Sequence, residues 1–283
     1  MSLNLANLTA KDILAMNYNE LISVVRETNR PPGGVSSVSH LATRAHLTKD
    51  SHVLEIGTST GITAIELARL VGCRITAIDI NERSIQEARR RAEALGVAHL
   101  ITFEVNDATS TGYPEDSFDL VFCGNVTSLI PDQKAALAEY SRVVRPGGFI
   151  AAIPMYYVKT PSKKLLADVT EAIQVTVEPL EEQYWLDFFL GDGRISFHQD
   201  KYTFDWISDE VVDGFVKDIL TRPHLDELSA KARAALVEQY SVFMRLFRDN
   251  LSQMGYTELL VRCEVDELGE PELFTASPVG VQR

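Results

Sequence analysis

The stretch Val53-Leu-Glu-Ile-Gly57-Thr-Ser-Thr-Gly61-Ile-Thr-Ala64 decides the fold of this chain. A short apolar run ends in a glycine-rich turn, and the turn opens a segment with a helical pattern. Glycines let a ligand approach the backbone closely, and the first turn of a helix offers unpaired N–H groups. The stretch therefore predicts a strand, a ligand-binding loop and a helix in succession.

The residues around the glycines narrow the kind of ligand. The spacing between Gly57 and Gly61 does not fit the dinucleotide-binding pattern G-x-G-x-x-G. Glu55 lies two residues before the first glycine. Its carboxylate would repel a pyrophosphate, but it would attract a cationic amino acid or a sulfonium.

Polar residues also follow the next three apolar strands. Asp79 lies 22 positions beyond Gly57, where the second strand of a doubly wound sheet ends and a carboxylate accepts hydrogen bonds from ribose hydroxyls. Asp107 follows the third strand, where its carboxylate is placed to accept a hydrogen bond from an adenine amino group. The fourth strand ends at Gly124 and Asn125, over the same cleft.

Strands and helices alternate between residues 52 and 153, which predicts an α/β fold with a parallel sheet covered by helices on both faces. The predicted strands are apolar throughout, as burial on both faces requires. Residues 10–28 and 35–47 predict two helices before the sheet. Residues 194–206 alternate between apolar and polar side chains and predict a hairpin.

These four motifs, taken in order, resemble those of class I S-adenosylmethionine-dependent methyltransferases of the small-molecule, quinone-biosynthesis-like type. Phe118-Asp-Leu-Val121 and Arg145-Pro-Gly-Gly148 resemble two further motifs of that family. The resemblance covers roughly residues 50–154, and a strand pair at about 256–276 resembles the antiparallel addition to the family's sheet. It implies a Rossmann-like, mostly parallel seven-stranded sheet with an antiparallel terminal strand. Ser59 stands where the family usually has a glycine.

The resemblance implies S-adenosylmethionine as cofactor, S-adenosylhomocysteine as product, and in-line methyl transfer to an O, N or C atom of a small molecule. The residues that it implies for cofactor binding are Glu55, Gly57, Thr58, Ser59, Gly61, Asp79, Ile80, Asn106, Asp107, Ala108, Gly124 and Asn125.

Three regions are expected along the chain. Residues 1–48 would form a helical N-terminal lid. Residues 49–154 and 255–283 would form the cofactor-binding core. Residues 155–254 would form an insertion that caps the substrate side.

No residue stands out as an obligatory catalytic base, which is consistent with catalysis by positioning. The side chains that we consider for that role are His40, His198 and Tyr156. Aromatic residues that could contact the substrate are Tyr18, Tyr157, Trp185 and Phe188.

The composition restricts the partners. Lys and Arg number 27 and Asp and Glu 40, so the net charge is −13. A chain this acidic is unsuited to bind nucleic acid or an anionic membrane. We therefore expect a small-molecule substrate, and the question of a homodimer stays open. The three cysteines form no CxxC pair, which favours a cytoplasmic location, and we expect no metal site.

Three alternatives stay open at this stage. The first is a protein or RNA methyltransferase, although the net charge disfavours RNA. The second is an adenosylmethionine-binding protein that transfers no methyl group. The third is a nicotinamide oxidoreductase on a similar sheet, which the glycine spacing disfavours.

Overall fold

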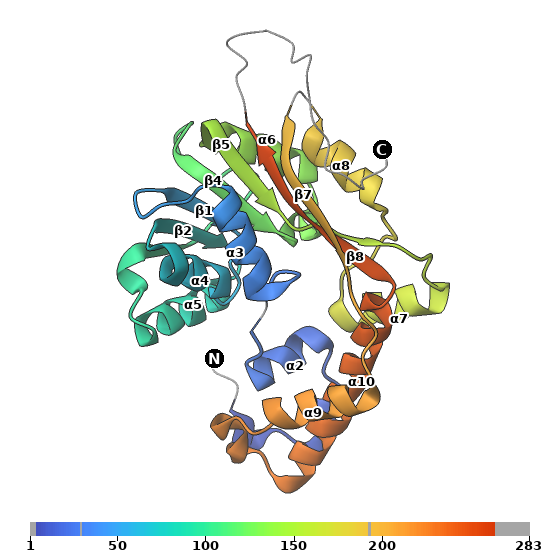
Figure 1. The fold of residues 1–283 in the computed structure, drawn as a ribbon. Helices are drawn as coiled ribbons and strands as arrows, with labels where there is room; N and C mark the ends of the chain where they lie inside the picture. The colour runs from blue at the N-terminus through green and yellow to red at the C-terminus, as the bar shows by residue number, and fades with distance from the viewer. Residues whose placement is uncertain (1–3, 29, 192–193, 264–283) are drawn as a thin grey trace.

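Apolar runs and helical segments alternate between residues 52 and 152, and there the chain builds a mainly parallel sheet with helices on both faces (Figure 1). The computed structural model describes residues 4–28, 30–191 and 194–263. Within them the strands are β1 His52–Ile56, β2 Arg74–Asp79, β3 Ile101–Val105, β4 Phe118–Gly124, β5 Val144–Ala152, β6 Met155–Tyr157, β7 Ile195–Thr203 and β8 Met254–Arg262.

The helices fall before, between and after these strands. The α-helices are α1 Ala10–Leu14, α2 Tyr18–Val25, α3 Gly34–Arg44, α4 Ile62–Val71, α5 Glu82–Ala94, α6 Gln133–Val143, α7 Lys163–Ile173, α8 Glu182–Leu190, α9 Asp209–Ile219 and α10 Ala230–Leu251. The described residues also form four 3₁₀ segments: η1 Leu5–Asn7, η2 Ala98–Leu100, η3 Val126–Leu129 and η4 Pro223–Glu227.

The strand order confirms the predicted fold class. The sheet runs β3-β2-β1-β4-β5-β8-β6, and β7 also pairs with β8. Strands β1 to β5 are parallel, and β8 is antiparallel to β5, β6 and β7. The described residues hold eight strands instead of the seven expected.

Two predicted elements are wrong, each for a local reason. Residues 194–206 form no hairpin, because β7 is one continuous strand that pairs with β8. Residues 10–28 form two helices, because the side chain of Asn17 accepts a hydrogen bond from the N–H of Glu20 and starts a new helix there. The strand expected at 272–276 lies outside the described residues.

Alternation along the strands explains why both faces of the sheet are covered. In β1, Val53 joins the apolar cluster beneath α3, α4 and α5, whereas Leu54 and Ile56 join the cluster beneath α6 and α8. Successive strand side chains point to opposite faces, so an unbroken apolar run supplies both clusters.

A helical lobe packs beside the sheet (Figure 1). It consists of α1, α2, α7, α9 and α10, which share a third apolar cluster. Helix α10 ends at Leu251, only a short turn before β8 begins at Met254. The lobe is therefore tied directly to the edge of the sheet. Within the described ranges, no helix is both long and apolar enough to cross a membrane.

Candidate functional site

The glycine loop follows β1 and forms one wall of a cavity of about 420 Å³, which we call the loop cavity. Gly57 has φ +69°, and a Cβ there would lie 2.4 Å from a methyl carbon of Val126. Gly61 has φ +85° and precedes α4, and its Cβ would lie 2.8 Å from that of Ala88 in α5. Only glycine allows these two close approaches.

The loop cavity brings together half of the residues predicted to bind the cofactor. Those that line it are Glu55, Gly57, Thr58, Ser59, Gly124 and Asn125. The lining that the sequence did not identify is Arg30, Pro31, Pro32, Gly33, Ile56, Thr63, Phe122, Cys123, Val126, Leu129, Met155, Phe204 and Leu251. The Pro-Pro-Gly-Gly sequence at 31–34 stands out as a break between two predicted helices, and it could have identified part of this wall.

Glu55 is the buried charge of the loop cavity. Its side chain is 3% exposed, and Oε2 accepts a hydrogen bond of 2.7 Å from the hydroxyl of Thr58. Burial raises the pKa of this carboxyl to about 7. No ion pair to Glu55 occurs among the described residues. A carboxylate held in this way would be stabilised by a cationic group in the cavity.

Asp79 ends β2 and holds the loop in place. Its carboxylate accepts backbone hydrogen bonds from Ser59, at 2.8 Å, and from Asn81, also at 2.8 Å. Ser59 has φ +48°, a left-handed conformation that glycine adopts at less cost. Asp79 does not line the loop cavity in the structure, but its carboxylate retains acceptor capacity for further hydroxyl groups.

The predicted residues beyond β2 and β3 lie outside the loop cavity. Ile80 is 78% exposed and Ala108 is buried. Asn106 donates to the carbonyl of Thr111. The carboxylate of the exposed Asp107 accepts hydrogen bonds from the N–H and hydroxyl of Thr109, and these lower its pKa. Gly61 is the residue that precedes α4, and it does not line the loop cavity either.

A second cavity of about 410 Å³ opens beside the first, and we call it the lobe cavity. Four residues line both cavities: Asn125, Leu129, Met155 and Leu251. The other walls of the lobe cavity are mainly apolar and come from α7, the segment after it, α8 and α10.

Three of the aromatic side chains considered earlier line the lobe cavity. Tyr156 accepts a hydrogen bond from the hydroxyl of Thr257 at 3.1 Å. Tyr157 donates to the side-chain oxygen of Asn250 at 2.7 Å. Trp185 donates to the backbone carbonyl of Met155 at 3.0 Å. These bonds fix the three rings as parts of the wall.

The other two aromatic candidates lie outside both cavities. Phe188 packs against Trp185 with ring centroids 5.9 Å apart. Tyr18 packs within the helical lobe against Phe247, with ring centroids 4.4 Å apart. Because Phe247 lines the lobe cavity, Tyr18 supports this wall from behind.

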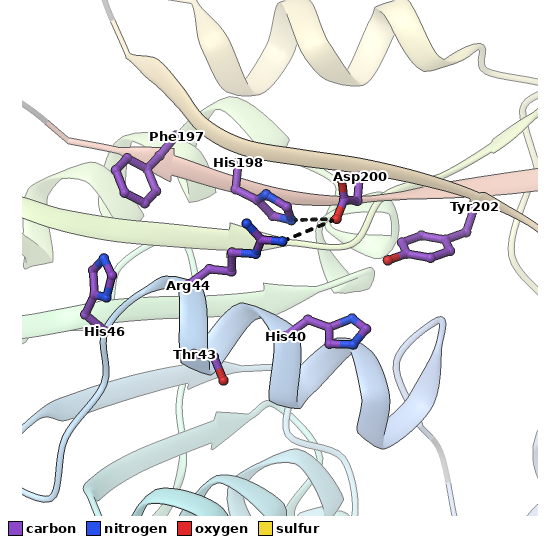
Figure 2. Close-up of a pocket in the computed structure, with 8 residues that line it drawn as sticks. All are labelled: His40, Thr43, Arg44, His46, Phe197, His198, Asp200 and Tyr202. Carbon is purple, nitrogen blue, oxygen red and sulfur yellow. Dashed lines mark ion pairs between the residues drawn. The ribbon is translucent and has the colours of Figure 1, made fainter. Parts of the chain in front are cut away.

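The two histidines considered as bases lie together, away from the loop and lobe cavities. They line a third cavity of about 670 Å³ between α3 and β7 (Figure 2). We call it the histidine cavity; its lining is His40, Thr43, Arg44, His46, Phe197, His198, Asp200 and Tyr202. Burial lowers the pKa of His198.

Comparison with known proteins bears on this arrangement. A family profile described as "Methyltransferase domain" matches residues 53–148, which contain the loop and the ends of β1 to β4. An uncharacterized protein of Haemophilus influenzae is 30% identical over 186 residues, which are 65% of this chain and 73% of that protein.

Two further matches carry assigned names. The ubiquinone/menaquinone biosynthesis C-methyltransferase of Paracoccus denitrificans is 36% identical over 122 residues, 41% of this chain and 47% of that protein. A SAM-dependent methyltransferase of Geobacter sulfurreducens, solved with S-adenosylhomocysteine, has a TM-score of 0.63 at 19% identity, covering 86% of this chain and 97% of that one. The aligned segment thus spans less than half of the named quinone enzyme.

Proposed function

Because the chain belongs to the class I S-adenosylmethionine-dependent methyltransferases, we propose that it methylates a largely apolar small molecule held in the lobe cavity. The observation that carries this proposal is the continuity of two cavities through shared walls. Asn125, Leu129, Met155 and Leu251 line both the loop cavity and the lobe cavity. A donor on the glycine loop and an acceptor beside the helical lobe would meet at these residues.

The family match confirms the predicted family, enzyme class and cofactor, and with them small-molecule methyl transfer as the reaction.

The loop cavity suits a cationic donor. S-adenosylmethionine, when bound, supplies a methyl group activated by a sulfonium. On the protein side, Glu55 provides a buried carboxylate whose hydrogen-bond donors are the neutral hydroxyl and N–H groups of Thr58, Thr63 and Ala64. A positive group of the donor would favour the ionised form of Glu55, which burial alone disfavours.

The lobe cavity suits an apolar acceptor with a neutral polar end. Its volume lies within the roughly 300–1,000 Å³ that small-molecule sites occupy. Val169, Ile173, Val175 and Leu180 supply apolar walls, and Glu178 is the one charged side chain among the described residues that line it.

Methyl transfer here would depend on positioning. Of the described residues that line the loop and lobe cavities, none is His or Lys. Burial raises the pKa of Tyr156, so its hydroxyl keeps its proton and is a poor base. The walls would orient an acceptor atom that is nucleophilic on its own and would exclude water from the methyl group.

The test is to incubate the full chain with S-adenosylmethionine and a panel of apolar small molecules, and to measure S-adenosylhomocysteine by mass spectrometry. Product that depends on one acceptor, with calorimetric binding of the donor, supports the proposal. Donor binding without turnover across the panel would assign a non-methylating function, and turnover only with protein or RNA would overturn the acceptor class.

We further propose a cytoplasmic location, a homodimer, no nucleic-acid partner, and a division into an N-terminal lid, a core and a substrate-side cap. The three cysteines are unpaired, as a reducing compartment would keep them. Cell fractionation tests the location, and light scattering of the purified chain tests the oligomeric state.

A further inference from the structure

Beyond the methyltransferase site, a second cluster of chemically active side chains lies in the lining of the histidine cavity and directly beside it. His198 and Asp200 come from β7 and Glu258 from β8, and one ligand atom from each lies within 4.8 Å of the other two. His40 approaches from α3, with Nδ1 at 3.2 Å from one carboxylate oxygen of Glu258 and 3.3 Å from the other.

The strand register explains why these groups meet. His198 and Asp200 are two residues apart on β7, so their side chains share one face of the sheet. Asp200 pairs directly with Glu258 in the β7–β8 ladder, which places that carboxylate on the same face. Helix α3 crosses this face and brings His40 over it (Figure 2).

We propose that His40, His198, Asp200 and Glu258 form a binding site for a divalent transition-metal ion, with Zn²⁺ the best fit. Two ligands about 2.0–2.1 Å from a tetrahedral zinc ion lie about 3.3 Å apart. His198 Nε2 lies 3.1 Å from Asp200 Oδ2, and the His40–Glu258 distances are similar. The ligand atoms of His198, Asp200 and Glu258 already lie within 4.8 Å of one another, and His40, which contacts Glu258, would turn toward them to act as the fourth ligand.

The burial and the charge of these side chains also favour a bound cation. The side chain of Glu258 is 1% exposed, and among the described residues it contacts the Ser37 hydroxyl, at 2.6 Å, and the half-exposed His40. His198 is about nine-tenths buried, and its Nε2 makes no hydrogen bond to a described residue despite its proximity to Asp200. A divalent ion would neutralise the buried carboxylate and use the imidazole lone pair.

The ligand types favour zinc over the alkaline-earth ions. Mg²⁺ and Ca²⁺ prefer sites built of oxygen, whereas two imidazoles with carboxylates suit zinc and its first-row neighbours. Arg44 is the competing cation, because its Nη2 lies 3.9 Å from Asp200 Oδ2. Its side chain is 54% exposed, so it is free to turn toward solvent when an ion enters.

The site would tie α3 to the edge of the sheet. Ser37 lies on α3, next to the turn that contains Gly33, and Gly33 lines the loop cavity. An ion that holds His40 to Glu258 would thereby steady one wall of the methyltransferase site. Metal binding itself does not depend on the proposed acceptor or on methyl transfer.

The test uses the full chain, stripped of metal with a chelator, and titrates Zn²⁺ in competition with a chromophoric chelator. One equivalent of tight binding is expected, with no comparable affinity for Mg²⁺. His198→Ala and Asp200→Asn should each weaken zinc binding by at least about tenfold. His46→Ala, in the same cavity but outside the proposed ligands, should leave it unchanged.

Arg44→Ala should change the zinc affinity in the opposite direction. Removal of a competing cation should tighten zinc binding, whereas a structural role for the His–Asp–Glu cluster alone would not produce this change. Cobalt substitution adds a spectroscopic check, because a tetrahedral site gives intense visible absorption. Absence of zinc binding, or zinc binding that survives His198→Ala and Asp200→Asn in folded protein, would overturn the proposal.

Discussion

At the residue scale, Glu55 is a buried carboxyl group whose ionisation opposes folding. Burial raises its pKa to about 7, above the usual value of about 4.3. The folded chain therefore holds a proton that the unfolded chain releases between these two pH values. As a result, the contribution of Glu55 to the free energy of unfolding is most favourable below about pH 4.5 and is lost as the pH rises through 7.

Replacement of Glu55 by Gln should therefore stabilise the ligand-free chain at pH 8. Each pKa unit corresponds to about 1.4 kcal/mol, so we expect a gain of about 1–3 kcal/mol in the free energy of unfolding. The gain should shrink toward zero at pH 5, where wild-type Glu55 is already protonated in the folded state. Urea unfolding of both proteins at the two pH values measures it.

The same substitution should weaken donor binding by about tenfold or more at pH 8, because the neutral amide no longer attracts a cation. In the wild type, donor affinity should fall as the pH drops below 7, since a proton must then leave Glu55. Calorimetry against S-adenosylmethionine checks both effects. Equal affinity of the Gln variant and the wild type would contradict a role for Glu55 in binding the donor.

Ser59 carries backbone strain that a glycine would relieve. Its φ of +48° lies in the left-handed region, which costs a residue with a Cβ about 1–2 kcal/mol. Ser59→Gly should raise the free energy of unfolding, by about 1 kcal/mol or less because glycine is also more flexible in the unfolded chain. Ser59→Ala is the matched control: it removes the hydroxyl, keeps the strain and should give no gain.

At the scale of elements, the sequence predicted those helices and strands whose ends are marked by a local signal. Helix α4 begins and ends as expected because Gly61 and Gly72 adopt positive φ at its two ends. The same signal marks the glycine loop and the end of β4, where Gly57 and Gly124 adopt positive φ. Helix α8 was not predicted, since aromatic burial against β6 and the sheet, and not a local cap, fixes it.

Contacts between distant elements account for the rest of the site. Leu251 reaches the loop cavity only because α10 turns directly into β8. Phe204 lies just after β7. The alternating pattern of β7 also fits a hairpin, so the sequence alone did not reveal that this strand pairs with β8. Local propensity does not encode such pairings, which depend on packing across the whole chain.

Helix α8 holds β6 through one hydrogen bond, from Trp185 Nε1 to the carbonyl of Met155. Trp185→Phe keeps an aromatic ring but leaves this carbonyl without its partner, which costs about 1–3 kcal/mol of stability. Because Trp185 lines the lobe cavity but not the loop cavity, the KM for the acceptor should rise while the Kd of the donor changes little. Steady-state kinetics and calorimetry separate these two quantities.

Gln183→Ala is the control for that substitution. Gln183 lies on α8 two residues before Trp185, on an exposed position outside both cavities, and its side chain donates only to Asp187 among the described contacts. We expect near-wild-type stability and kinetics. An equal loss in both variants would mean that α8 acts by general packing and not through the Met155 carbonyl.

At the scale of the molecule, the proposed donor and acceptor sites lie mainly on different parts of the fold. The parallel sheet supplies the loop cavity, whereas the helical lobe supplies most of the lobe cavity. This division allows one to be altered without the other. Val175 lines only the lobe cavity and is 38% exposed, so a larger side chain can enter the cavity there without disturbing a packed core.

Val175→Trp should therefore fill part of the lobe cavity while leaving the sheet intact. We expect the Kd for S-adenosylmethionine to stay within about twofold of wild type, and kcat/KM for the acceptor to fall by at least about tenfold. Val237→Trp, on an exposed face of α10 outside the cavities that the structure describes, should change neither. Unchanged turnover in Val175→Trp would contradict an acceptor site at this wall, because the indole ring would occupy part of the cavity of about 410 Å³.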